Sequence, residues 1–198
     1  AEIVRIYGAI GGVPAYLDKW DAAKSFKDNI CRLVLTPSGA LYGEADAVIS
    51  SELRELSAYS TILAAIARGE NKLNDIFHAT GFSRAKISVY LKNLAAFNIV
   101  EKVVSFETGG WENAKKGVYQ IKDTFVNFWF KFVYPNMSNL YLLSPEEFYD
   151  TYIDKELDAY LERYFREVCT EYLLILNQMG QLPFTIKRVG TWIGKTGR

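Results

Sequence analysis

This chain of 198 residues has few histidines and cysteines and no excess of either charge, and each of these features excludes a class of function. The single histidine, His78, excludes a His-based catalytic triad and a multi-histidine metal site. The two cysteines, Cys31 and Cys169, fit neither a zinc motif nor a disulfide framework, so we expect two buried thiols and a cytoplasmic, reducing environment. Basic and acidic residues balance at 23 each, which excludes a uniformly basic nucleic-acid coat. No run approaches the roughly 20 apolar residues of a membrane span, so we expect no membrane partner.

What is present is a helical pattern broken by turns. Up to residue 56 the apolar spacing predicts short helices, with a sharp corner at residues 11–14 (GGVP) and an N-cap at Ser25 for a helix over 26–35. Ser144 with Glu147 forms a capping box that predicts the start of a later helix, whose apolar face continues to about Leu176.

The middle of the chain has the order helix, helix, helix, hairpin. Ser57 is the expected cap of the first helix, residues 73–79 form the second, and Ser83 caps a third with an apolar face that repeats every three or four residues. Residues 99–106 and 117–121 then alternate as two strands around a polar tip. This order predicts a winged helix whose third helix occupies the recognition position.

The aromatic segment after the hairpin predicts a core helix. Asp123 caps residues 124–133, which carry four aromatic side chains at helical spacing and should pack between the winged helix and the following helices. The last alternating stretch, 184–189, predicts a strand with which an incomplete sheet begins.

Charge is divided along the chain although it cancels overall. Residues 83–122 carry a net charge of +4, and residues 144–171 carry −6. Because the apolar face of the third helix must point inward, its opposite face should meet double-stranded DNA, aided by the lysines of the wing. The candidate DNA-binding residues are Ser83, Arg84, Lys86, Ser88, Lys92, Lys115 and Lys116. An ordinary solvated helix face and a protein-docking face remain alternatives, and Trp111 at the wing tip either stacks on a ligand or folds back.

No group of residues predicts catalysis. The segment 190–196 (GTWIGKT) is one residue short of a phosphate-binding loop. The acidic residues between 146 and 171 are typical of a solvated helix face rather than a catalytic pair.

Two strings in the chain resemble a known family. Residues 7–17 (YGAIGGVPAYL) resemble the GGVPxYL signature in the helical lid of prokaryotic AAA-type ATPases common in archaea. Residues 123–136 (DTFVNFWFKFVYPN) resemble that family's DxFxxFWFxFVYPN segment, and residues 57–122 are similar to its winged helix. The remainder resembles the opening of a restriction-endonuclease-like domain.

The resemblance implies a parent protein whose upstream ATPase domain binds ATP and Mg, with no cofactor in this chain. It implies that Gly12 and Pro14 border the nucleotide, although a purely structural corner explains them equally well. It also places Glu167 at the first metal position of a nuclease-like fold whose other ligands would follow Arg198. We therefore expect neither ATP hydrolysis nor DNA cleavage by this chain.

Together these observations predict a mainly α protein with a minor β part. Its expected parts are a helical lid-like segment (1–56), a winged-helix domain (57–134) and C-terminal helices with the start of a nuclease-like domain (135–198). The expected function is DNA binding coupled to nucleotide state in the parent. A protein-docking module and a free-standing winged-helix regulator are the alternatives.

Overall fold

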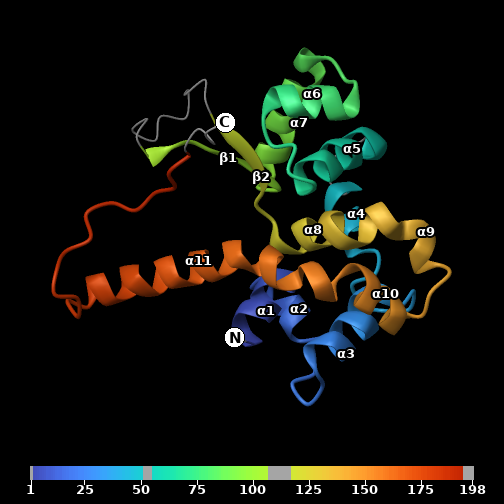
Figure 1. The fold of residues 1–198 in the computed structure, drawn as a ribbon, viewed down its shortest axis with the longest axis horizontal. Coiled ribbons are helices and arrows are strands. Elements are labelled where there is room, and N and C mark those ends of the chain that lie inside the picture. The colour runs from blue at the N-terminus through green and yellow to red at the C-terminus, as the bar shows by residue number, and fades with distance from the viewer. Residues whose placement is uncertain (1, 51–54, 107–116, 194–198) are drawn as a thin grey trace.

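The computed structural model describes residues 2–50, 55–106 and 117–193 and is mainly helical, with one two-stranded antiparallel sheet, as expected (Figure 1). The elements are α1 (Glu2–Ile10), α2 (Pro14–Leu17), α3 (Phe26–Ile30), the π-helical η1 (Cys31–Leu35), α4 (Glu44–Ser50), α5 (Leu56–Ala67), α6 (Leu73–Thr80), α7 (Arg84–Ala96), β1 (Val100–Val103), β2 (Val118–Ile121), α8 (Thr124–Phe128), the π-helical η3 (Trp129–Val133), the 3-10 turn η4 (Tyr134–Asn136), α9 (Met137–Leu140), α10 (Pro145–Tyr152) and α11 (Asp154–Gln178).

Side-chain caps fix most helix starts where the sequence predicts them. Ser25 and Ser144 form capping boxes with Asp28 and Glu147, in which each side chain satisfies a backbone N–H of the other residue. Asp123 accepts a hydrogen bond from the backbone N–H of Val126 at 2.8 Å. The expected cap at Ser57 is wrong, because α5 already includes Leu56 and its N-cap position is Glu55, which makes no side-chain capping bond.

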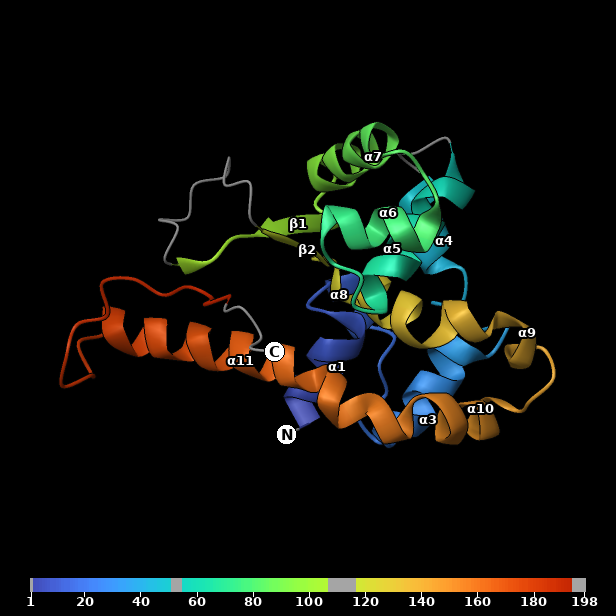
Figure 2. The same ribbon diagram turned by 45° about the horizontal axis from the view of Figure 1, so that its top comes forward.

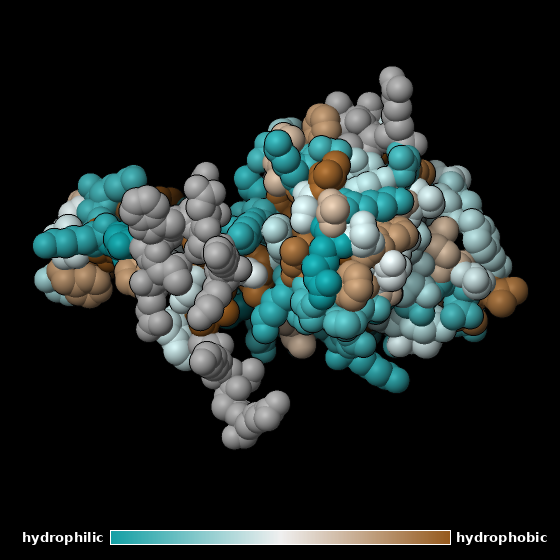
Figure 3. All heavy atoms as spheres, turned by 90° about the horizontal axis from the view of Figure 1, so that it is seen from above, coloured by the Kyte–Doolittle hydropathy of each residue, from teal (hydrophilic) through white to brown (hydrophobic). Residues whose placement is uncertain are grey.

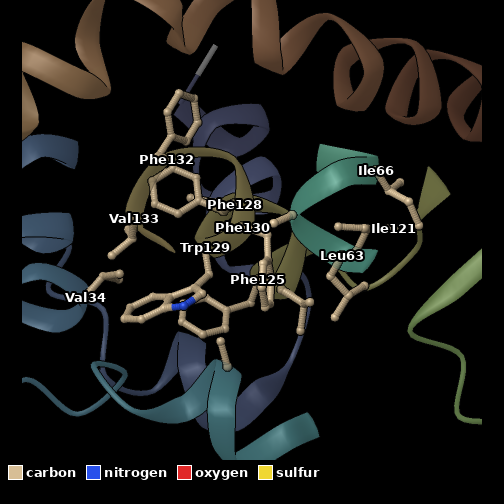
Figure 4. Packing of buried hydrophobic residues seen from close by; sticks show 14 of the residues in the cluster. Val34, Leu63, Ile66, Ile121, Phe125, Phe128, Trp129, Phe130, Phe132 and Val133 are labelled. Carbon is tan, nitrogen blue, oxygen red and sulfur yellow. The ribbon is translucent and has the colours of Figure 1, made fainter. Parts of the chain in front are cut away.

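The aromatic helix forms the centre of the core (Figure 4). Phe128, Trp129, Phe130 and Phe132 are all buried, which means that most of the surface of α8 and η3 is covered. Their neighbours are α1, α5, β2 and α11, and Tyr160 of α11 makes edge contacts with two of these rings. The prediction of an aromatic core helix between the hairpin region and the following helices is therefore confirmed. A single buried cluster draws residues from the beginning, middle and end of the chain.

Helices α5, α6 and α7 with strands β1 and β2 form what we call the helix–hairpin unit, residues 55–106 and 117–121. The strands pair antiparallel from Val100 opposite Ile121 to Val103 opposite Val118. Helix α5 is buried on most of its surface because α6 and β2 cover one side and η3 covers another. Helix α7 packs on α6 and β1 at the outside of the unit, far from α10 (Figure 2).

Helix α11 is packed only along its first half. Leu157, Leu161 and Tyr164 are buried, but Phe165 and Tyr172 expose 58% and 60% of their surface, so the expected apolar contact face ends well before Leu176. The second half projects from the body of the molecule (Figure 1). In Figure 3 this projecting end, at the left, carries brown apolar side chains beside teal polar ones.

The predicted strand over 184–189 is wrong, because these residues have no regular secondary structure. The Asn177 side chain binds both backbone groups of Ile186, and no strand of the described residues lies beside the segment to complete a ladder. Alternating apolar residues form a strand only where a neighbouring strand accepts their backbone hydrogen bonds.

Candidate nucleic-acid interface

The turn between α6 and α7 sets the direction of the exposed helix. Gly81 ends α6 in the left-handed conformation at φ +71°, a region that side chains with a Cβ rarely enter. Two residues later the Ser83 hydroxyl accepts a hydrogen bond from the Lys86 backbone N–H at 3.2 Å. Because this cap satisfies one orphan donor, α7 begins at a fixed point immediately after the turn.

Helix α7 has one buried and one exposed face. Ile87, Tyr90, Leu91 and Leu94 are buried against the rest of the helix–hairpin unit. Arg84, Ser88 and Lys92 are exposed and follow one another at intervals of four residues, which places them in one row. Figure 3 views the molecule from the side of the unit and shows a mainly polar surface with separate apolar side chains.

Arg84 is held in place by two neighbours on α6. Its Nη2 donates to Asn74 Oδ1 at 2.6 Å, and its guanidinium carbon lies 4.2 Å from the centroid of the Phe77 ring. Neither partner is charged, so within the described part of the chain the Arg84 guanidinium is held in position by groups that do not neutralise it. A guanidinium has five N–H donors, and those left over can reach an oxyanion.

Lys86 is half-buried, and its ammonium group contacts other side chains of the protein instead of facing solvent as the sequence predicts. Its Nζ lies 3.8 Å from Glu55 Oε2 and 4.6 Å from the Phe82 ring centroid. The Tyr90 hydroxyl donates to the same Glu55 carboxylate, and this hydrogen bond, followed by burial, raises the pKa of Tyr90 to about 12. Glu55 thus offsets part of the charge that Lys86 would offer to DNA.

Part of the expected wing lies outside the described residues. Lys115, Lys116 and Trp111 all fall in the segment 107–116. The described part of the hairpin carries one exposed cation, Lys102 on β1, beside α7.

The proposed nucleotide border lies at the corner between α1 and α2. Gly11 has φ +69°, Gly12 and Pro14 are exposed, and Pro14 occupies the first turn of α2. A Cβ on Gly11 would lie 3.4 Å from Thr124 Cβ, so the corner touches the first residue of α8. Gly12 and Pro14 offer a nucleotide only backbone and apolar surface, with no phosphate or metal ligand of their own.

Glu167 is part of an ion-pair cluster. Its Oε1 lies 2.7 Å from Arg163 Nε, while Arg163 Nη2 lies 3.7 Å from Glu101 Oε1 on β1. Arg163 Nη1 also donates to the carbonyl oxygen of Ile121 at 2.8 Å, which links α11 to both strands of the hairpin. This link could not be predicted from the sequence, since a lone arginine on a predicted helix gives no signal of a partner 42 residues away. Within the described ranges no three His, Cys, Asp or Glu side chains gather as a metal site would require.

The protein is mainly helical, with helices α6 and α7 and a hairpin at its edge. Its C-terminal part is similar to a family of unknown function. Residues 129–197 match the profile of a family described as archaeal and bacterial proteins of unknown function. An uncharacterized protein of Methanocaldococcus jannaschii, MJECL04, is 33% identical over 192 residues. That alignment covers 96% of this chain and 42% of the relative, so the chain spans less than half of the relative's length. No solved structure matches the chain significantly.

No helix in the described part of the chain is both long enough and apolar enough to cross a membrane.

Proposed function

We propose that this chain is the DNA-binding part of a cytoplasmic AAA-type ATPase and that it binds double-stranded DNA through α7 and the adjacent hairpin. The observation that carries the proposal is the exposed row of Arg84, Ser88 and Lys92 on the outer face of a capped helix. Among the described residues the elements packed against α7 are α6 and β1, and neither is an acidic helix that covers this row.

The dimensions and chemistry of α7 suit the major groove. A helix of 13 residues is about 20 Å long, and the groove of B-DNA admits a single helix. Arg84 and Lys92 supply cations for phosphates, and Val89 exposes an apolar side chain that suits a thymine methyl group. The Ser88 hydroxyl donates to the Arg84 carbonyl oxygen at 2.8 Å, so toward DNA it serves as an acceptor.

The coupling to nucleotide state rests on the corner at Gly11. In the proposed parent, ATP and Mg bind to the upstream ATPase domain and supply the energy of the cycle, while Gly12 and Pro14 border the nucleotide. The corner touches Thr124, and the Tyr16 ring lies 5.6 Å from the Phe125 ring. Because α8 follows β2 after two residues, a shift of the corner would reach the hairpin through a short rigid path.

Fluorescence anisotropy with a labelled duplex tests the DNA proposal. Each phosphate contact contributes about −0.9 to the slope of log affinity against log salt, which is about eightfold in affinity at 0.1 M salt. The double variant Arg84→Ala/Lys92→Ala should therefore bind about 60-fold more weakly, with a slope reduced by about 1.8.

The control is Lys24→Ala, which removes an exposed cation far from α7 and should leave affinity unchanged. Absence of salt-dependent binding by the unaltered protein, or equal affinities of the double variant and the control, would refute the proposal. In the full-length parent, an affinity that does not change between the ATP-bound and ADP-bound states would refute the coupling alone.

Protein docking is the second candidate, and the exposed apolar second half of α11 favours it. Phe165, Tyr172, Leu173 and Ile175 are all exposed on a helix that projects from the body. A helix with apolar residues on several sides is usually covered by other protein. Crosslinking of the full-length parent without DNA tests this candidate. Contacts over α11 would support docking there and leave α7 available for DNA, whereas contacts over α7 would place protein on the surface that the first proposal assigns to DNA.

A further inference from the structure

The chain after α11 returns to the hairpin, at the residues that follow β1. Gly180, at φ +66°, reverses its direction, and Asn177 then fixes Ile186 with hydrogen bonds of 3.3 and 2.7 Å to its carbonyl oxygen and N–H. Figure 1 shows the red end of this segment beside the yellow-green chain that follows β1. We call residues 184–193 the returning segment.

Two hydrogen bonds donated by backbone N–H groups attach the returning segment to the hairpin. The Phe106 N–H donates to the Thr191 carbonyl oxygen at 2.8 Å, and the Ile193 N–H donates to Ser105 Oγ at 3.2 Å. Gly190 lies so close to Phe106 that a Cβ at this position would come within 2.4 Å of the ring. The segment therefore runs beside the residues that follow β1, attached to them but without forming a strand.

Arg188 acquires a defined position through this attachment. Its guanidinium carbon lies 4.5 Å from the centroid of the Phe106 ring, and the side chain is exposed. No carboxylate in the described part of the chain pairs with it. Stacking on an aromatic face orders a guanidinium while its edge, which carries the N–H donors, stays available to an oxyanion.

We propose that the returning segment is part of the DNA interface and that Arg188 binds a backbone phosphate next to the site read by α7. This inference rests on the proposed DNA-binding function, because it extends the same surface. Strand β1 carries the exposed Lys102 and packs against α7, so Arg188 adds a cation to a hairpin that already lies beside the reading helix. Phosphate contacts on the flank of a reading helix fix its register on the duplex.

The test compares single variants of the whole chain by anisotropy on one duplex. Arg188→Ala should lower the affinity about eightfold at 0.1 M salt and reduce the salt slope by about 0.9, as expected for one lost phosphate contact. Arg188→Lys keeps the charge and should retain most of the slope. Arg166→Ala is the matched control, because Arg166 is an exposed arginine on α11 outside the returning segment.

Hydrogen exchange measured by mass spectrometry gives an independent readout. Peptides that cover residues 184–193 should exchange more slowly when DNA is bound, whereas peptides from the loop around Lys24 should not change. If the α7 double variant weakens binding but Arg188→Ala behaves like Arg166→Ala and the returning segment shows no protection, this inference fails and the DNA function stands. If the unaltered protein binds no DNA, both fail together.

Discussion

Arg163 offers the sharpest test of how the helix–hairpin unit is held to the helical body. The variant Arg163→Met keeps most of the aliphatic length and removes three polar contacts, to Glu167, Glu101 and the Ile121 carbonyl oxygen. The Arg163 side chain is only 22% exposed, so water cannot replace the guanidinium freely.

The magnitude of this loss follows from the exposure of the partners. Breaking a fully buried ion pair costs about 3–5 kcal/mol, because the remaining charge is left without a partner. The side chains of Glu101 and Glu167 are 39% and 41% exposed and regain water, which lowers the cost toward that of one charged hydrogen bond. We therefore expect a loss of about 2 kcal/mol in the free energy of unfolding and a Tm lower by about 4–8 °C.

Urea unfolding followed by circular dichroism measures this loss. Arg166→Met, three residues further along the same helix and exposed, is the control and should change stability by less than about 0.5 kcal/mol. Arg163→Lys should lie between the two, because an ammonium keeps the charge but cannot serve all three acceptors as a guanidinium fork does. If Arg163→Met costs no more than Arg166→Met, the described link contributes nothing and the reasoning is refuted.

Two further predictions concern the cap of α7 and the buried thiol. Ser83→Ala should lower the free energy of unfolding by about 1 kcal/mol, whereas the mid-helix control Ser88→Ala should not, and equal losses in thermal melts would contradict the capping role. Burial raises the pKa of Cys31 to about 12, so its thiol should resist iodoacetamide at pH 9 in a Cys169→Ser background until urea unfolds the protein. Because the pKa of Cys31 in the folded protein lies above the usual 9.0, the part of the free energy of unfolding that depends on its neutral thiol is complete below pH 9 and is lost as pH rises toward 12. Fast alkylation of the folded protein would disprove the burial of this thiol.

Local signals predicted the parts of this fold that local chemistry decides. Ser25, Ser83, Asp123 and Ser144 each bind a backbone N–H three residues later, an interaction contained within the sequence itself. The period of α7 likewise predicted the buried face formed by Ile87, Leu91 and Leu94, because one helix face must be apolar wherever it packs. Phe97 continues the same period but is exposed, because it lies just beyond the end of the helix.

Contacts between distant segments could not be predicted in this way. The stretch 184–189 has the alternation of a strand, but Asn177 and the residues that follow β1 hold the returning segment as irregular chain. Lys86 occupies an expected DNA-facing position, but Glu55, which lies 31 residues earlier, binds it. Both outcomes depend on partners whose proximity only the folded chain establishes.

The burial of the aromatic helix has a consequence for how the helix–hairpin unit can be inherited or engineered. Leu63, Ile66 and Ile121 pack near the rings of α8 and η3, as Figure 4 shows, so the side of the unit that faces α8 and η3 is apolar. Excised alone, it would present this apolar surface to water and would tend to aggregate. Recombination between proteins would therefore have to transfer the unit together with residues 123–134, and a graft that omits them should yield insoluble product.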